Sequence, residues 1–178
     1  MKINLVNKKL IVLDRDGCIN VPSSNKYITH VNDFEIYSDV IPFLDTILEK
    51  KIRVAIATNQ QGIAKGLYSE EDVLEMHHSM LLKLKSELKD FPIYICPHFA
   101  GTCDCRKPSG KLLKQAILEA NTTPSETVFI GDQETDFNAA NDAEVDFIYL
   151  NRQLKIKFPG EYQMISTLSE YTKDMLSI

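Results

Sequence analysis

The chain has 178 residues, 44% of them hydrophobic and 25% charged, a composition typical of one folded globular domain and not of a disordered chain. Its formal net charge of −5 argues against a broad basic surface for nucleic acid. An anionic ligand would therefore need local positive charge, supplied by a metal ion or by a few placed Lys and Arg side chains.

The amino-terminal segment has no uninterrupted apolar run of signal-peptide length, because Lys8 and Lys9 interrupt it. No later stretch approaches the length of a transmembrane helix. We therefore expect a cytoplasmic protein without a membrane partner, in which the four cysteines stay reduced. No pattern typical of an interface stands out, so we expect a monomer.

Short apolar runs alternate with amphipathic stretches along the rest of the chain. In order, the pattern predicts a strand at Lys9–Asp14, a helix at Asp39–Lys51, a strand at Ile52–Thr58, a helix at Ser69–Lys89, a strand at Ile93–Cys96, a helix at Gly110–Ala120, a strand at Thr127–Gly131, a helix at Glu134–Ala143, a strand at Asp146–Leu150 and a helix at Ser166–Leu176. The strands are continuous apolar runs, so both faces of their sheet should be covered. The sequence predicts an α/β fold, a single domain over 1–178 with a doubly wound, mostly parallel sheet.

Two of the helices begin with clear capping signals. Asp39 is expected as an N-cap, with Pro42 in the first turn. Ser69 is expected as the N-cap of the longest helix, because three acidic residues follow it. That helix should bury one apolar face, made of Val73, Met76, Met80, Leu81, Leu84 and Leu88.

Polar clusters follow three of the predicted strands. Asp14 and Asp16 follow the first strand, Thr58 and Asn59 the second, and Asp132 the fourth. Ligands of doubly wound sheets bind at the carboxyl ends of the strands, so these side chains should meet in one crevice. Three carboxylates there would repel one another unless a cation held them, and oxygen ligands suit Mg²⁺. We expect a magnesium site at Asp14, Asp16 and Asp132.

An Asp at a strand end is, taken alone, more often a cap or a turn residue. The three clusters together favour chemistry instead. A carboxylate can attack phosphorus and form an aspartyl-phosphate, a role that suits Asp14. Asp16, two residues on, can protonate the leaving alkoxide. Thr58 and Asn59 offer polar groups for phosphate oxygens, and Lys107, just before a predicted helix, offers the balancing cation.

The motifs DRDG at Asp14, TNQ at Thr58, RKP at Arg106 and GDxxxD at Gly131 resemble, in order, the four signature motifs of the haloacid-dehalogenase-like (HAD) phosphohydrolases. The resemblance implies a HAD-like Rossmannoid sheet and a magnesium-dependent phosphatase acting on a small phosphorylated metabolite. It also implies the roles of five residues: nucleophile, acid/base, two phosphate-holding groups and the last metal ligand, which fall on Asp14, Asp16, Thr58, Lys107 and Asp132. No segment between the motifs is large enough for a separate cap domain, so a minimal or absent cap is expected.

Four potential zinc ligands lie within ten residues, in the pattern C-x-H-x₄-C-x-C. Three thiols and one imidazole form a closed tetrahedral set, so we expect a structural zinc loop at about 96–105 held by Cys96, His98, Cys103 and Cys105. The alternative is four unrelated loop residues. Because the loop directly precedes Arg106 and Lys107, zinc would fix the segment that presents these cations. The remaining cysteine, Cys18, is expected to be a small packed residue.

A C-x-H…C-x-C loop before RKP is similar to two groups of bacterial HAD phosphatases, one acting on D-glycero-D-manno-heptose 1,7-bisphosphate and the other on histidinol phosphate. The TNQQGIAKG stretch and Asn20 resemble the heptose group more closely, whereas the short gap between His98 and Cys103 resembles the histidinol group. The heptose bisphosphate is therefore the expected substrate. We expect five residues to contact it, namely Asn59, Gln60, Gln61, Arg106 and Lys107, with Arg106 and Lys65 as cations for its second phosphate.

Three other functions remain open at this point. A zinc-stabilised binding module without catalysis is disfavoured because all five expected catalytic positions are filled. A DNA 3′-end phosphatase is disfavoured by the acidic net charge and by the lack of a basic or aromatic tract. A phosphosugar mutase would usually need a cap.

Overall fold

Six strands lie side by side in one sheet, all parallel, in the order β3-β2-β1-β4-β5-β6. The computed structural model describes residues 3–24, 27–85, 91–153 and 158–176. In these ranges the strands are β1 (Leu10–Leu13), β2 (Arg53–Asn59), β3 (Ile93–Cys96), β4 (Thr127–Gly131), β5 (Asp146–Leu150) and β6 (Gln163–Ile165). The chain crosses over at β1, which pairs with both β2 and β4, and this is where the carboxyl ends of parallel strands form a crevice.

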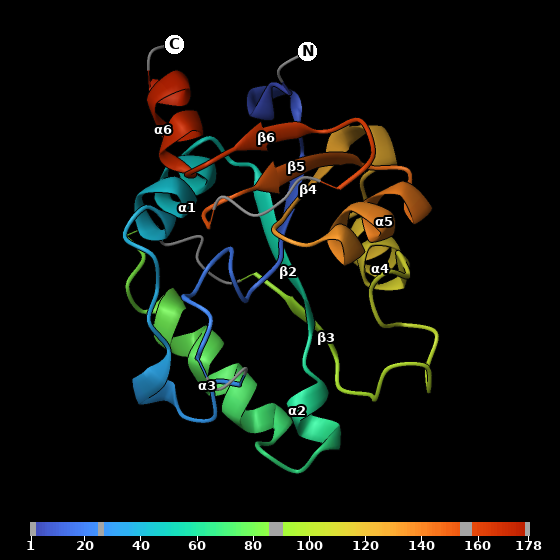
Figure 1. The fold of residues 1–178 in the computed structure, drawn as a ribbon. Coiled ribbons are helices and arrows are strands. Elements are labelled where there is room, and N and C mark those ends of the chain that lie inside the picture. Colours follow the sequence, from blue (N-terminus) through green and yellow to red (C-terminus); the bar gives the residue numbers. More distant parts are fainter. Residues whose placement is uncertain (1–2, 25–26, 86–90, 154–157, 177–178) are drawn as a thin grey trace.

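Helices cover both faces of the sheet (Figure 1), which confirms the predicted doubly wound α/β fold. Their bounds are α1 (Val40–Glu49), α2 (Gln61–Ala64), α3 (Glu70–Leu81), α4 (Lys111–Glu119), α5 (Glu134–Asp142) and α6 (Ser169–Leu176). Figure 1 shows α1 and α6 on one side with α3 below α1, α4 and α5 on the other side, and α2 beyond the end of β2. Three short 3₁₀ turns complete the described elements, at Leu5–Asn7, Val31–Asp33 and Pro124–Glu126.

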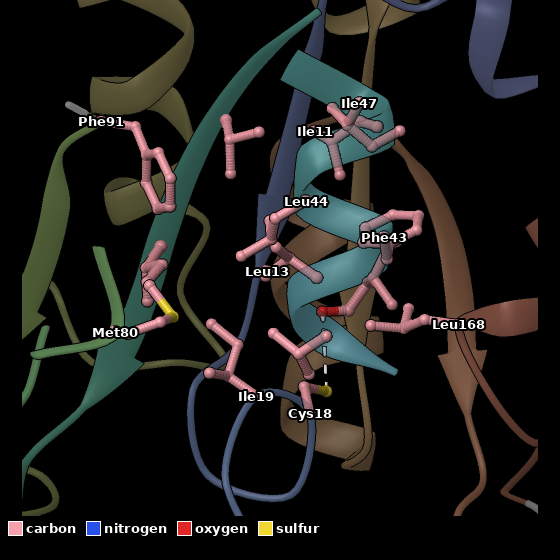
Figure 2. Packing of buried hydrophobic residues seen from close by; sticks show 14 of the residues in the cluster. Ile11, Leu13, Cys18, Ile19, Phe43, Leu44, Ile47, Met80, Phe91 and Leu168 are labelled. Carbon is pink, nitrogen blue, oxygen red and sulfur yellow. Dashed lines mark hydrogen bonds between the residues drawn. The ribbon is translucent and has the colours of Figure 1, made fainter. Parts of the chain in front are cut away.

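The buried apolar residues form two clusters, one on each face of the sheet. The first joins β1 to α1 and extends to α3 and α6; Figure 2 shows Ile11 and Leu13 of β1 facing Leu44 and Ile47 of α1. Both faces of β1 are therefore buried, as its continuous apolar sequence requires. Cys18 lies in this cluster with no exposed surface, and its Sγ points to the Ile130 carbonyl oxygen at 3.8 Å, as expected for a packed residue.

Several details differ from the sequence prediction. The long helix begins as predicted, with a capping box between Ser69 and Asp72, but it ends at Leu81 and does not continue toward Lys89. A turn follows, and the main-chain N–H of Lys85 donates a hydrogen bond to the buried Asp45 at 2.8 Å, so the chain leaves the helix axis there. Residues 86–89 of the predicted helix lie outside the described residues.

The strand β6 was missed because its sequence carries no apolar run. Only one of its three residues, Ile165, is buried, and its pairing with β5 defines it. The last helix begins at Ser169, three residues later than predicted. Within the described ranges, no helix is both long and apolar enough to cross a membrane.

Asp39 stands at the N-cap position of α1, as predicted, but its side chain does not cap that helix. It accepts hydrogen bonds from both Arg152 terminal nitrogens at 2.8 and 2.9 Å, from Thr167 Oγ1 at 2.7 Å and from the Leu168 N–H at 2.8 Å. Burial raises the pKa of Asp39, but the hydrogen bonds and charge of these partners outweigh it, so the pKa lies below its usual range. The carboxylate thus ties α1 to the start of α6.

Replacing Asp39 with Asn should therefore destabilise the protein by about 3 kcal/mol at neutral pH, because the Arg152 charge loses its buried partner. A depressed pKa contributes stability above the ordinary carboxyl value near 4, and that stability is lost as pH falls through the folded pKa. Urea unfolding of both proteins at pH 7 and near pH 3 should show the difference shrinking at low pH. The exposed Asp33→Asn variant is the matched control, expected within about 0.5 kcal/mol of wild type.

Candidate active site

The crevice at the carboxyl ends of the strands gathers three buried carboxylates. Asp14 follows β1, Asp132 follows β4, and Asp136 lies in the first turn of α5; one oxygen from each lies within 4.8 Å of the others. The pairing of β1 with β4 brings the first two together. Gly17 has a φ of +90°, and a side chain there would overlap the Asp132 carboxylate, so glycine allows this close approach.

Lys107 lies against two of these three carboxylates and is only 3% exposed. Its ammonium nitrogen lies 2.6 Å from Asp14 Oδ1 and 2.7 Å from Asp136 Oδ1, and it donates a further hydrogen bond to the Ala57 carbonyl oxygen at 2.9 Å. These three partners come from the ends of β1 and β2 and from α5. The expected cation is therefore in contact with the expected nucleophile.

Burial raises the pKa of Asp14 to about 7, although the Lys107 ammonium acts in the opposite direction. Burial likewise raises the pKa of Asp136 against the effect of Lys107. For Lys107 itself, burial lowers the pKa but the two carboxylates outweigh it, so the lysine stays charged. When all three carboxylates are ionised they outnumber the one ammonium by two charges, which fits a divalent cation with oxygen ligands.

The composition of this cluster differs from the expected magnesium set in one position. Asp136 belongs to it, and the carboxylate of Asp16 does not. Sequence reasoning gave Asp136 no role, although the GDxxxD spacing contains the signal: one helical turn separates the two acids. Asp136 Oδ2 also accepts hydrogen bonds from the main-chain N–H groups of Asp132 and Gln133 at 3.1 and 3.0 Å, so it fixes the loop that carries Asp132.

The Asp16 carboxylate faces a different set of partners. Arg15 Nη2 lies 3.0 and 3.1 Å from its two oxygens, Asn20 Nδ2 donates to Oδ1 at 3.0 Å, and Gln60 Nε2 donates to Oδ2 at 2.8 Å. Burial raises the pKa of Asp16, but these donors, Arg15 first, bring it below its usual range. Its side chain is 38% exposed, so it borders the open side of the crevice.

The residues at the end of β2 and just after it lie beside the carboxylates. Thr58 is buried, and its Oγ1 accepts a hydrogen bond from Gln60 Nε2 at 2.8 Å. Asn59 clamps the main chain of Lys107: its Nδ2 donates to the Lys107 carbonyl at 3.1 Å, and its Oδ1 accepts from the Lys107 N–H at 3.0 Å. Gln60 is 1% exposed, whereas Gln61 is half-buried at the start of α2.

Arg106 and Lys65 are the two cations expected from sequence for a second phosphate. Arg106 precedes Lys107 and is half-buried, and its Nη1 is buried without a hydrogen-bond partner among the described residues. A buried guanidinium nitrogen in that state is costly unless an anion satisfies it. Lys65 is exposed, and its ammonium donates to the Tyr27 hydroxyl at 2.8 Å.

The four expected zinc ligands converge on one point. The three Sγ–Sγ distances among the cysteines are 3.3, 3.5 and 3.6 Å, and His98 Nδ1 lies 3.8 Å from Cys96 Sγ and 3.4 Å from Cys105 Sγ. Tetrahedral zinc with bonds of about 2.3 Å places its sulfur ligands about 3.8 Å apart. The donor set and its spacing therefore fit zinc.

The thiols of this cluster have different acidities. Burial raises the pKa of Cys105 to about 12, with the neighbouring thiols adding to the effect. Burial acts the same way on Cys103, but main-chain N–H donors at Arg106 and Cys105 outweigh it and lower the pKa to about 7. Zinc must displace the thiol protons, so a metal bound here would bind more weakly as pH falls.

The loop that carries these ligands is joined to the crevice. The Gln60 N–H donates to the Cys96 carbonyl at 2.8 Å, and the Ala64 N–H donates to the Pro97 carbonyl at 3.1 Å. Residue Cys105 is also only two positions before Lys107. The cysteine cluster therefore supports the segment that holds the buried lysine.

Comparison with known families and sequences places these motifs in context. Residues 9–162 match the family model described as polynucleotide kinase 3 phosphatase. The chain is 36% identical over 148 residues to the D-glycero-alpha-D-manno-heptose-1,7-bisphosphate 7-phosphatase of Campylobacter jejuni, a match that covers 83% of this chain and 84% of the relative. It is also 33% identical over 138 residues to the histidine biosynthesis bifunctional protein HisB of Buchnera aphidicola, covering 76% of this chain and 39% of that protein.

Among solved structures, the fold is similar to the D,D-heptose 1,7-bisphosphate phosphatase from B. bronchiseptica complexed with magnesium and phosphate. The TM-score is 0.83 at 22% sequence identity, covering 95% of this chain and 98% of that one. At this identity the likeness establishes the fold, and the sequence matches establish the family.

Proposed function

The chain belongs to the family of HAD phosphatases that contains the heptose-1,7-bisphosphate 7-phosphatases, and from this premise we propose that it hydrolyses D-glycero-D-manno-heptose 1,7-bisphosphate to heptose 1-phosphate through a phospho-aspartate on Asp14. As a member of that family it is a phosphoric monoester hydrolase. The single observation that best supports the site assignment is the buried contact of Lys107 with Asp14 and Asp136 in a cluster of three carboxylates.

In this proposal, Asp14 is the nucleophile. With its Oδ1 held by Lys107, we assign attack on phosphorus to Oδ2. Thr58 and Lys107 bind the phosphate oxygens, and the lysine balances charge that develops on them. Asp16 gives its proton to the leaving sugar oxygen as the P–O bond breaks, and later removes a proton from the water that hydrolyses the phospho-aspartate.

The proton transfer from Asp16 needs its carboxyl protonated, and its pKa in the ligand-free protein is low. A bound phosphate dianion beside it raises that pKa, because like charges disfavour ionisation. Substrate binding therefore favours the protonated form of Asp16, which is the form that donates a proton to the leaving oxygen.

Two metals belong to the proposal. Asp14, Asp132 and Asp136 would hold Mg²⁺, with Asp16 as the further ligand expected from sequence. The magnesium ion would neutralise negative charge on the transferring phosphoryl group. Cys96, His98, Cys103 and Cys105 would hold a structural zinc that keeps Arg106 and Lys107 in place. We further propose one domain over 1–178 and a cytoplasmic monomer without nucleic-acid or membrane partners.

Loss of one thiol ligand tests the zinc assignment. Cys105→Ser should reduce bound zinc from about one per chain to nearly none, and should lower kcat/KM about tenfold or more, because the loop before Lys107 loses its anchor. Zinc content measured by atomic spectroscopy on the purified protein checks this. Cys18→Ala removes a cysteine outside the cluster and should leave the zinc content unchanged. Wild-type protein that carries no zinc would contradict the assignment.

A comparison of three substrates tests the proposed specificity. Phosphate release with Mg²⁺ should be compared as kcat/KM for heptose 1,7-bisphosphate, histidinol phosphate and a 3′-phosphorylated oligonucleotide. We expect a preference of about a hundredfold or more for the heptose, or about 2.7 kcal/mol in transition-state binding. Arg106 supports this expectation, because it directly precedes Lys107 and its guanidinium can form two hydrogen bonds to the second phosphate of a bisphosphate. Arg106→Met should raise KM for the bisphosphate more than for histidinol phosphate, which has a single phosphate.

Histidinol phosphate is the second candidate. It is favoured by the four-residue gap between His98 and Cys103 and by the match to a histidine biosynthesis protein. A reversed kcat/KM preference would establish it. Fast release from the oligonucleotide would instead assign the chain to nucleic-acid end repair, despite its net charge of −5. Failure on all three would leave the phosphatase family in place and exclude this substrate assignment.

A further inference from the structure

We propose that Gln60 and Tyr68 are positioning residues for the acid/base: the Gln60 amide holds the Asp16 carboxylate, and the Tyr68 hydroxyl anchors the other end of that amide. The inference rests on the proposed function, in which Asp16 moves the proton. It assigns to Gln60 a role other than the substrate contact expected from sequence.

The hydrogen bonds of Gln60 use both ends of its amide. Nε2 donates to Asp16 Oδ2 and to Thr58 Oγ1, each at 2.8 Å, and Oε1 accepts from the Tyr68 hydroxyl at 2.7 Å. The side chain is 1% exposed, so it has little room to move, whereas the Asp16 side chain is 38% exposed. A buried amide therefore restrains a carboxylate that could otherwise turn toward solvent.

Tyr68 is itself held in place by the chain around it. The residue is 8% exposed, and its ring lies 6.3 Å from that of Tyr27. A side chain at Gly62 would overlap the Tyr68 ring and hydroxyl, so glycine at this position leaves the space that the ring occupies. Because the ionised Asp16 carboxylate can only accept, the amide presents its N–H groups to it, and its oxygen is left to accept from the Tyr68 hydroxyl on the other side. If the amide were flipped, Gln60 Oε1 would face Asp16 Oδ2, and the two oxygens would repel each other.

The proton transfer explains why this orientation matters. As Asp14 forms its bond to phosphorus, the ester P–O bond breaks, its electron pair goes to the leaving oxygen, and that oxygen takes the proton from Asp16. An alkoxide from a sugar or an alcohol needs this proton. p-Nitrophenolate does not, because it is a stable anion at neutral pH. A defect in the placement of Asp16 should therefore affect alkyl phosphates and spare p-nitrophenyl phosphate.

Tyr68→Phe removes only the hydroxyl. We expect single-turnover release of the leaving group to slow about tenfold or more for the better of the two alkyl phosphates, heptose 1,7-bisphosphate or histidinol phosphate, with little change in KM. Release of p-nitrophenolate should change by less than about threefold, because general acid catalysis contributes little there. Single-turnover measurement keeps the later hydrolysis of the phosphoenzyme from hiding the effect.

Two further variants make the test independent of folding defects. Gln60→Glu keeps the shape and the acceptor for Tyr68 but removes the donor to Asp16, and should show the same selective loss. Tyr94→Phe is the matched control, because it removes a hydroxyl that donates to Glu119 at 2.8 Å from the edge strand β3. It should leave both rates unchanged.

Asp16→Asn separates the possible failures. If this variant is selective for alkyl phosphates but Tyr68→Phe slows both substrates equally, or neither, the positioning role is wrong and the proposed function stands. If Asp16→Asn slows both substrates equally, the acid role of Asp16 fails, and the positioning role fails with it. Selective loss in Asp16→Asn, Gln60→Glu and Tyr68→Phe together would establish the chain of contacts from Tyr68 to the acid.

Discussion

Asp14→Asn is expected to abolish phosphate release, with kcat reduced at least about 10³-fold, because the amide cannot serve as the nucleophile that forms the covalent intermediate. Asparagine has nearly the shape of aspartate, so Lys107 keeps its contact with Asp136 and the sheet is not disturbed. Phosphate release and trapping of the phosphoenzyme, both at saturating Mg²⁺, measure the loss.

Stability distinguishes this loss from unfolding. Burial raises the pKa of Asp14 to about 7, well above its value in an unfolded chain. A group of this kind contributes stability below its unfolded pKa and loses it as pH rises through its folded pKa, here between about 4 and 7. At pH 8 without metal, a neutral amide in place of this carboxyl avoids the loss, so Asp14→Asn should unfold at the same temperature as wild type or higher.

The exposed Asp104→Asn variant supplies the control for the nucleophile assignment, since its side chain is 80% exposed and pairs with Lys111 at the surface. It should retain nearly full activity. Substantial turnover by Asp14→Asn, with phosphoenzyme still trapped, would show that another residue attacks phosphorus.

Lys107→Met should remove both activity and metal-free stability. The ammonium is the one charge that offsets Asp14 and Asp136 in direct contact among the described residues, and its removal leaves buried carboxylates unpaired. We expect a loss of about 3 kcal/mol in unfolding free energy with chelator present, and a fall in kcat/KM of about 10³-fold or more. Because the carboxylates must then ionise without a cation, the stability loss should grow as pH rises through neutrality.

Magnesium gives this prediction a second, independent readout. A divalent cation bound by Asp14, Asp132 and Asp136 would offset the excess charge, so Mg²⁺ should raise the unfolding temperature of Lys107→Met more than that of wild type. Lys111→Met is the matched control: its lysine is 56% exposed and pairs with an exposed aspartate, so little change is expected. A failure of Mg²⁺ to stabilise either wild type or Lys107→Met would contradict a metal site at this cluster.

The fold class and most of the site follow from the pattern of residues along the chain. Continuous apolar runs such as Ile11–Leu13 identified buried parallel strands, because only a sheet covered on both faces tolerates them. Strand ends in parallel sheets converge, so the positions of Asp14, Thr58 and Asp132 in the chain were enough to place them in one crevice. The close spacing of the three later cysteines and His98 likewise predicted their cluster, because a loop of ten residues can bring all four side chains to one point.

Other features depend on contacts between residues distant in the chain, and these emerge only when the chain is folded. The strand β6 exists because β5 offers it an edge, and the turn after Leu81 depends on Asp45, forty residues before Lys85. Neither feature has a local sequence signal, because the secondary-structure propensity of a segment does not show which distant segment it will contact.

The same reason explains the differences at the site. Asp136 belongs to the carboxylate cluster because Lys107, from another segment, contacts it. The Asp16 side chain faces Gln60 instead, because the Gln60 amide donates a hydrogen bond to it. Sequence spacing showed that acids would be near the crevice. The contacts with Lys107, the Gln60 amide and the Tyr68 hydroxyl determine which of these acids face each other, because a buried polar group must have a hydrogen-bond partner.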